Sequence, residues 1–140
     1  MEAVQAKVRL APRVPVYYEL DGTNPSSPYT AGPGSFIHDL LTLAGAANVA
    51  AAAAGPFPRI SAEEIIRANP ELIIVPIGGF SPPDVADPQR FAQRPGWEAI
   101  EAVRRRAIRG VDADLVSRPG PRLVDGLKAL ARTIHPEVFG

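Results

Sequence analysis

The residues with the clearest chemical potential lie in "SSPYTAGPGSFIHDLLTLAG", residues 26–45. Gly32 and Gly34 allow a ligand to approach the backbone closely, and a helix that begins near Ser35 would point its unpaired amides at that ligand. A nucleotide site would need a Gly-Lys-Ser/Thr sequence or Gly-x-Gly-x-x-Gly after a strand, and neither is present. These motifs therefore leave two interpretations of residues 26–45 open: the wall of a ligand site and the simple start of a helix.

The sequence offers no convincing set of residues for catalysis. Ser35 lacks the Gly-x-Ser-x-Gly elbow of serine hydrolases. Asp112 and Asp114 lie on a polar turn, where carboxylates more often cap or face solvent than bind a metal. His38 is expected on the outer side of its helix and His135 at a helix end. Cysteine is absent, which excludes thiolate chemistry and cysteine metal sites. We therefore expect a protein that is not an enzyme, with no cofactor and no metal site of its own.

Strands and helices alternate along the chain, which predicts an α/β fold: a single Rossmann-like lobe with a mainly parallel sheet flanked by helices. "LIIVP" is a continuous apolar run of the kind found in parallel strands that are covered on both faces. Ser61 with Glu64 predicts a capping box, and Asp87 with Pro88 predicts the start of another helix. We expect strands at 14–20, 72–76 and 107–111 and helices at 35–45, 62–69, 88–94 and 121–135.

Three loops follow the predicted strands, at residues 21–34, 77–87 and 112–120. In an open parallel sheet, ligands bind beyond the carboxyl ends of the strands, where such loops converge and helix N-termini present free amides. We therefore expect these three loops to form the ligand site.

The overall charge excludes one class of partner. Lys plus Arg and Asp plus Glu number 15 each in 140 residues, so no long-range field would gather nucleic acid. A local basic cluster at residues 104–109 is typical of a solvated helix end and, less often, of a docking patch. The opening "MEAVQAKVRL" lacks the apolar core of a signal peptide, and no stretch reaches membrane-spanning length. We expect no nucleic-acid binding and no signal peptide within the chain itself.

Four stretches together resemble one family: "VYYEL", "YTAGPGSFIHDLLTLAGAANV", "PRISAEEIIRANPELIIV" and the region that runs from Trp97 to Glu137. In order and over nearly the whole chain, they resemble the C-terminal lobe of the periplasmic binding proteins that deliver cobalamin, haem or ferric siderophores to ABC importers. In that family, two α/β lobes are joined by a long rigid helix and hold the metal chelate between them. The resemblance implies that residues 1–11 are the tail of the joining helix and residues 12–140 the C-terminal lobe.

The resemblance also implies roles for single residues. Glu63 matches the glutamate through which the lobe docks on the importer's membrane subunits, while a favourable acid in a helix's first turn is its alternative explanation. Phe57 stands where relatives carry a cleft aromatic, with ordinary core packing as the alternative. The other expected ligand-binding residues are Thr30, Gly32, Ser35, Phe80, Asp114, Leu115 and Arg118.

The family is exported and two-lobed, so the parent protein is expected to be periplasmic or an extracytoplasmic lipoprotein. Without the missing N-terminal lobe, half of the cleft is absent, and we expect only weak chelate binding by this chain alone. The alternatives are a stand-alone interaction module and, third, a small α/β enzyme. An uncovered cleft face would drive formation of a homodimer through partly exposed apolar residues, namely Val4, Val8, Phe57, Phe80 and Trp97.

Overall fold

Four parallel strands form one sheet in the computed structural model, which describes residues 13–22, 24–53, 55–78, 85–113 and 123–135. The strands are β1 (Val14–Tyr18), β2 (Ala46–Asn48), β3 (Leu72–Ile77) and β4 (Ile108–Asp112). Their order across the sheet is β2-β1-β3-β4, and all three neighbouring pairs are parallel. The α/β fold with a parallel sheet, predicted from the alternation of elements, is confirmed.

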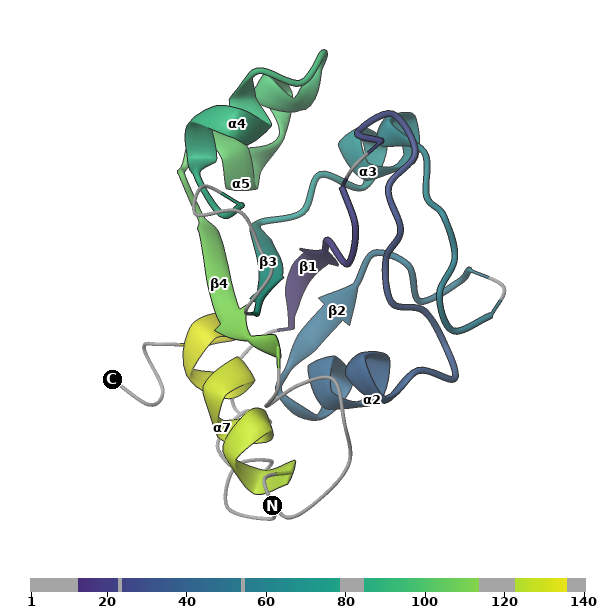
Figure 1. The fold of residues 1–140 in the computed structure, drawn as a ribbon, viewed down its shortest axis with the longest axis vertical. Coiled ribbons are helices and arrows are strands. Elements are labelled where there is room, and N and C mark those ends of the chain that lie inside the picture. The colour runs from purple at the N-terminus through teal and green to yellow at the C-terminus, as the bar shows by residue number, and fades with distance from the viewer. Residues whose placement is uncertain (1–12, 23, 54, 79–84, 114–122, 136–140) are drawn as a thin grey trace.

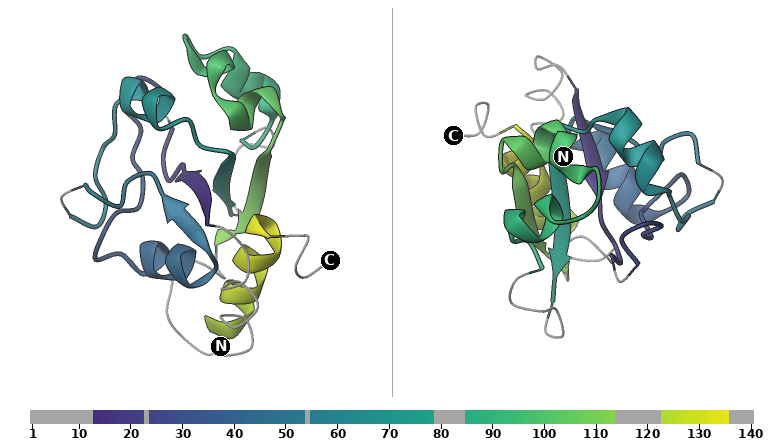
Figure 2. Two further views of the ribbon diagram at one scale, coloured as in Figure 1. Left: turned by 180° about the vertical axis from the view of Figure 1, so that it is seen from behind. Right: turned by 90° about the horizontal axis from the view of Figure 1, so that it is seen from above.

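Helices cover both faces of this sheet (Figures 1 and 2). One face carries α2 and α7, and the other carries α3, α4, the 3-10 turn η1 and α5. Each face buries its own apolar cluster. The helix bounds are α2 (Phe36–Leu43), α3 (Ala62–Ala68), α4 (Pro88–Ala92), η1 (Trp97–Ala99), α5 (Glu101–Arg104) and α7 (Leu123–Ile134).

Strand β3 shows why a continuous apolar run forms the centre of the sheet. Its side chains alternate between the two faces, so Ile74 joins the cluster under α2 and α7, while Ile73 and Val75 join the cluster under α3 and α5. All three are buried. Burial of side chains of this size contributes roughly 1.5–3 kcal/mol each.

The predicted helix starts are confirmed by side-chain caps. Ser35 Oγ accepts a hydrogen bond from the His38 amide at 3.0 Å. Ser61 Oγ accepts one from the Glu64 amide at 3.1 Å, as the capping box requires. At α4, Asp87 takes the N-cap position directly before a proline. Each cap satisfies an amide that would otherwise lack a partner within its helix.

The expectation that Trp97 is partly exposed is wrong. Trp97 is fully buried, because the short turn η1 places it in the apolar cluster that this face of the sheet shares with α3, α4 and α5. There it packs edge-on against Tyr17, with ring centroids 5.7 Å apart, and tilted against Phe91 at 6.0 Å. Val4, Val8 and Phe80 lie outside the described residues. Within the described ranges, no helix is long and apolar enough to span a bilayer.

Candidate ligand-binding site

Three loop segments run side by side beyond the carboxyl ends of β1 and β2. They comprise residues 19–22, 28–32 and 56–60, and isolated antiparallel bridges join Asp21 to Tyr29 and Tyr29 to Arg59. Backbone hydrogen bonds of 2.9–3.0 Å run from Tyr29 N to Asp21 O, from Thr30 N to Pro58 O and from Gly32 N to Pro56 O. These bonds hold loops that lie far apart in sequence in one fixed arrangement.

Thr30 and Ser35, both expected near the ligand, are buried in this arrangement. The Thr30 hydroxyl donates to Tyr18 O at 2.7 Å. The Ser35 hydroxyl donates to Gly32 O at 2.8 Å while it caps α2. Their hydroxyls therefore shape the loop from inside the protein, and ligand contact by these two residues stays a prediction.

Gly32 stands where two loops touch. A Cβ at this position would lie 2.7 Å from Gly55 O, closer than two such atoms approach in proteins. Only glycine allows the backbone of residues 30–35 to pack this closely on residues 55–58. The helix-start interpretation is confirmed, because Ser35 begins α2. Gly32 fixes the loop before that helix, and the wall of a ligand site stays a prediction.

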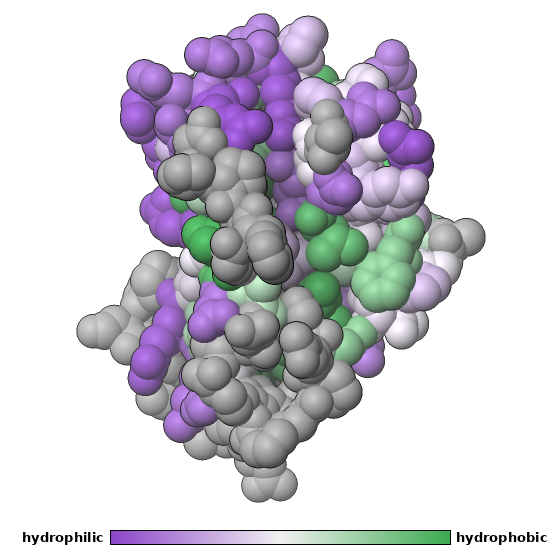
Figure 3. All heavy atoms as spheres, viewed as in Figure 1, coloured by the Kyte–Doolittle hydropathy of each residue, from purple (hydrophilic) through white to green (hydrophobic). Residues whose placement is uncertain are grey.

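An exposed group of three residues, here called the aromatic rim, consists of Tyr29, Phe57 and Arg59. Phe57 is 54% exposed and Tyr29 is 40% exposed, so Phe57 is not a core residue. The Arg59 guanidinium lies over the Tyr29 ring, 4.9 Å from its centroid. Figure 3 shows apolar residues grouped across the middle of one face of the molecule, below a hydrophilic upper part.

Tyr29 and Arg59 were missed by sequence reasoning. Their outward position follows from the burial of their neighbours in the structure: Pro28 and Thr30 are buried on either side of exposed Tyr29, and exposed Arg59 precedes buried Ile60. In an extended segment, alternate residues point to opposite sides. Tyr29 and Arg59 therefore project outward together from paired segments.

A cavity of about 710 Å³, here called the Glu19 cavity, lies between the ends of β1 and β3 and helix α4. Sequence reasoning did not predict it. Its walls are formed by the segment after β1, the end of β3 and the residues of and after α4: Glu19, Leu20, Asp21, Gly22, Pro25, Val75, Pro76, Val85, Arg90, Phe91, Gln93, Arg94 and Pro95.

Glu19 and Arg94 form a buried ion pair in this cavity. Both guanidinium nitrogens Nη1 and Nη2 donate to the carboxylate, at 2.5 and 2.9 Å. The Tyr17 hydroxyl donates to the same carboxylate at 3.0 Å. The guanidinium also packs on two rings, 4.3 Å from the centroid of Phe91 and 4.5 Å from that of Trp97. The charges of the pair are thus satisfied within the protein.

Burial, and next the negative charge of Glu19, raise the pKa of Tyr17 far above its ordinary value of 10.0. Burial also raises the pKa of Tyr18. Both phenols therefore stay protonated in the folded protein, and Tyr17 remains a hydrogen-bond donor to Glu19.

Asn48, at the end of β2, connects that strand to the loop of the site. Its Oδ1 accepts from Ala50 N at 3.0 Å and its Nδ2 donates to Ala31 O at 2.7 Å, so the orientation of the amide is fixed. The same Nδ2 lies 3.0 Å from His38 Nδ1, which must therefore accept. His38 is half-buried rather than on the outer surface as predicted.

The remaining predicted site residues fall into two groups. Glu63 is exposed in the first turn of α3, while the neighbouring Glu64 contacts the capping Ser61. Outside the described residues lie Phe80, Asp114, Leu115 and Arg118. The described part of the chain contains no group of three or more His, Asp or Glu residues that could hold a metal ion.

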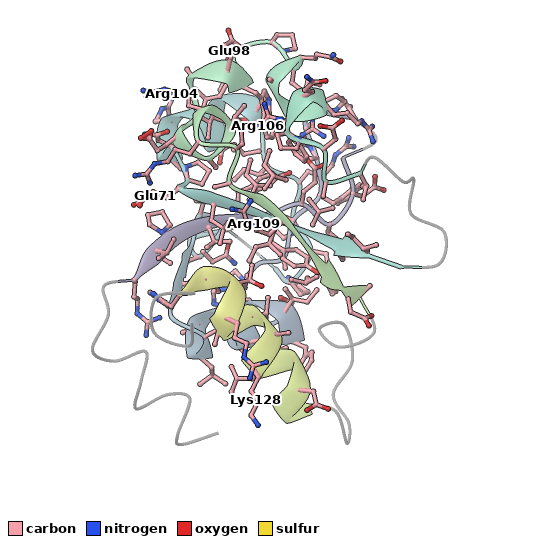
Figure 4. The ribbon with its side chains drawn as sticks, turned by 90° about the vertical axis from the view of Figure 1, so that its left-hand side faces the viewer. Glu71, Glu98, Arg104, Arg106, Arg109 and Lys128 are labelled. Atoms are coloured by element: carbon pink, nitrogen blue, oxygen red, sulfur yellow. The ribbon has the colours of Figure 1, made fainter. Side chains whose placement is uncertain are left out.

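The basic cluster near β4 is an exposed, ion-paired surface (Figure 4). Arg104 contacts Glu101 at 3.4 Å, and Arg105 contacts Glu71 and Glu101 at 3.9 Å. The Arg109 guanidinium turns back to Arg106 O and Ile108 O at the edge of the sheet. Exposed pairs of this kind contribute little stability. The exposure of the cluster fits a solvated face, and the docking patch stays an untested alternative.

Comparison with known sequences identifies the relatives of this chain. Residues 1–115 match the sequence profile of a family described as periplasmic binding protein. An uncharacterized ABC transporter substrate-binding lipoprotein, YvrC, of Bacillus subtilis (strain 168) is 34% identical over 111 residues, which are 79% of this chain and 33% of that protein. The vitamin B12-binding protein of Pectobacterium carotovorum subsp. carotovorum (strain PC1) is 32% identical over 103 residues, or 74% of this chain and 33% of that protein.

A solved structure shares the fold. The crystal structure of a possible iron-binding (periplasmic solute-binding) protein from Staphylococcus epidermidis ATCC 12228 superposes with a TM-score of 0.78 at 30% identity. The superposition covers 96% of this chain and 51% of that chain. The present chain thus spans about a third of the length of the two curated relatives and about half of this structure.

Proposed function

Because the chain belongs to the periplasmic binding protein family, we propose that it is the substrate-binding lobe of an ABC importer for a corrinoid or an iron chelate such as haem or a ferric siderophore. The family is one of binding proteins rather than enzymes. The names of two relatives support the class of substrate, since one binds vitamin B12 and another is a possible iron-binding protein.

The observation that carries the proposal is the aromatic rim. Two large rings, Phe57 and Tyr29, stand exposed beside the carboxyl ends of the strands, where parallel sheets bind their ligands. Exposed aromatic side chains on loops held by backbone hydrogen bonds suit a large flat ligand, because such surfaces stack without reorganisation of the loop. Gly32 and Ser35 support this surface from behind.

The Glu19 cavity is a weaker candidate for the chelate. Its central carboxylate and guanidinium already bind one another, and Tyr17 binds the carboxylate. A ligand that entered would gain no new charged partner from this pair, and separating the pair would be costly. We therefore assign the chelate to the rim.

The chelate would lie between this lobe and a second α/β lobe, to which residues 1–11 would connect as the tail of the joining helix. The parent protein would act outside the cytoplasm, as a periplasmic protein or a lipoprotein. The lipoprotein relative from Bacillus subtilis supports this location. A lobe that supplies half of a cleft buries little of a large chelate, so its own affinity would be weak.

Docking on the importer's membrane subunits is assigned to Glu63. The side chain is exposed at the start of α3, and the capping interaction involves Glu64 instead. An exposed carboxylate with no role in the cap is suited to a basic group of a partner. The partner's chemistry would be an arginine or lysine at the extracytoplasmic surface of the importer.

A second candidate function is an interaction module that self-associates. Besides the two rim aromatics, Ile77 is 43% exposed at the end of β3. Exposed apolar groups of this kind favour contact with a second copy of the chain. Light scattering over a dilution series distinguishes the two functions, because self-association would raise the mass with concentration in the absence of any chelate.

A chelate panel tests the proposed function. Cobalamin, haem and a ferric siderophore are titrated into the chain and followed by absorbance, with Phe57→Ala as the test variant. Ile77→Ala serves as the control, because it removes a comparably exposed apolar side chain that lies against Gly110 rather than on the rim. We expect weak binding of at least one chelate that Phe57→Ala lowers and Ile77→Ala leaves unchanged. No binding of any chelate, or equal effects of both variants, would contradict the proposal.

A further inference from the structure

We propose that Arg59 makes the site selective for macrocyclic chelates that carry a carboxylate at the edge of their conjugated face. The inference rests on the proposed function and adds to it the charge of the substrate. It follows from how Arg59 is held, from which of its donors are occupied and from which surfaces lie beside it.

Arg59 is held in place by its backbone and by its own side chain. The bridge to Tyr29 fixes its segment, and its Nε donates to Ser27 O at 3.1 Å. The guanidinium lies over the Tyr29 ring at 4.9 Å. These contacts reduce the rotamer freedom that a long exposed side chain would otherwise lose on binding a ligand.

The charge of Arg59 has no partner within the described part of the chain. An arginine has five N–H donors, and in that part of the chain a single hydrogen bond, from Nε, occupies them. By contrast, Arg94, Arg104 and Arg105 each contact a carboxylate of the protein. The outer edge of the Arg59 guanidinium, with Nη1 and Nη2, is thus available for an anion.

The neighbouring surfaces determine the kind of anion. Phe57 lies two residues before Arg59 in the same loop, and both side chains are exposed together with that of Tyr29. A flat macrocycle stacked on the exposed Phe57 ring would bring its edge toward the guanidinium that covers Tyr29. A carboxylate there accepts two parallel hydrogen bonds from an arginine. A macrocycle without an acid would cover the guanidinium and leave it without a partner, which is unfavourable.

Two matched pairs of ligands test the inference with the complete 140-residue chain. One pair is gallium(III) protoporphyrin IX and its dimethyl ester, and the other is cyanocobalamin and its monocarboxylic acid derivative. The proteins are the wild type, Arg59→Gln, Arg59→Lys and the control Arg67→Gln, which removes another exposed arginine, from the last turn of α3. Dissociation constants are measured by absorbance titration, and circular dichroism checks that each variant is folded.

We expect the wild type to prefer the acid in at least one pair by roughly tenfold or more, since even one charge-assisted hydrogen bond has an effect of that size. Arg59→Gln should reduce the preference to about twofold or less without weakening the ester or amide form. Arg59→Lys should keep part of the preference for the acid, because a lysine retains the charge and loses the paired donors. The control Arg67→Gln should keep the full preference for the acid. If only the porphyrin pair shows the preference, the carboxylate is that of a porphyrin. If only the cobalamin pair shows it, the carboxylate is that of a corrinoid.

Two results would overturn the inference and leave the proposed function intact: equal weakening of both members of a pair by Arg59→Gln, and no weakening of either. If the wild type binds none of the four ligands, this inference is overturned, and if it also binds no ferric siderophore, the proposed function is overturned with it. Higher salt should lower the preference of the wild type and leave that of Arg59→Gln unchanged, since only the wild type contributes the charge.

Discussion

Arg59 and Arg94 are both stacked on aromatic rings, and their surroundings give them opposite roles. Arg94 lies over Phe91 and Trp97 and binds the buried Glu19. Arg59 lies over the exposed Tyr29 and has no ion pair within the described residues. An arginine saturated by its own protein thus stabilises the fold, whereas one that is held in place without an ion pair is available to a ligand.

The largest expected effect comes from removing Arg94. Arg94→Ala would leave the Glu19 carboxylate buried without its partner, and such changes typically lower the free energy of unfolding by about 3–5 kcal/mol. Arg59→Ala, the matched change at the rim, should cost less than about 1 kcal/mol. Urea unfolding of both variants measures the difference. Similar losses for the two variants would remove the distinction between the two arginines.

A smaller loss is expected from Gly22→Ala. An added Cβ would lie 2.8 Å from Arg94 Nη2 and closer still to the Glu19 carboxylate, so the ion pair would have to shift. Overpacking of this kind costs about 1–3 kcal/mol. Gly78→Ala is the control, because its Cβ would meet the nearest atom, Ala113 Cβ, at an ordinary 3.7 Å. Thermal unfolding that shows no difference between the two variants would contradict the tight packing around the pair.

Alkaline pH should weaken the Glu19 region progressively. Tyr17 and Tyr18 have a raised pKa in the fold, so above pH 10.0, their ordinary value, the unfolded chain loses phenolic protons that the folded chain keeps. The unfolded state then binds fewer protons, and the free energy of unfolding falls by about 1.4 kcal/mol per pH unit for each phenol. Tyr17→Phe should halve the slope in unfolding experiments at pH 10–12. An unchanged slope would show that Tyr17 ionises in the fold.

The smallest effect on stability is expected for Glu63→Ala. The side chain is exposed, and its favourable position near the start of α3 is worth about 0.3–1 kcal/mol. In the two-lobed parent protein, the same change should weaken docking on the importer and leave chelate affinity unchanged. A pull-down with the membrane subunits measures the first and calorimetry the second. A matching loss of chelate affinity would move Glu63 into the ligand site.

The fold could be predicted because its determinants are local. The alternation of strands and helices gave the parallel sheet, and the capping residues Ser61 and Asp87 gave helix starts to within a residue. Each of these signals depends on neighbours within about four positions. The strand ends were less accurate, since the first strand ends at Tyr18 rather than at residue 20.

The site could be predicted only in part, because its key contacts join residues that lie far apart in sequence. Glu19 and Arg94 are 75 positions apart, and the bridge between Tyr29 and Arg59 joins two loops from different strands. The periodicity of apolar residues along the sequence does not indicate contacts between residues this far apart. The resemblance to a family pointed to Phe57, which is exposed as a ligand contact requires, but the local sequence did not reveal the unpaired arginine beside it.

Nuclear magnetic resonance of the ¹⁵N-labelled chain, titrated with cyanocobalamin and with gallium(III) protoporphyrin IX, tests the central claim most directly. The amides of the rim, at Tyr29, Phe57 and Arg59, should shift most. Those of the Glu19 cavity, such as Gly22 and Gln93, should shift little. Shifts concentrated at the cavity, or no shifts with either chelate at millimolar concentration, would contradict the assignment of the ligand site to the rim.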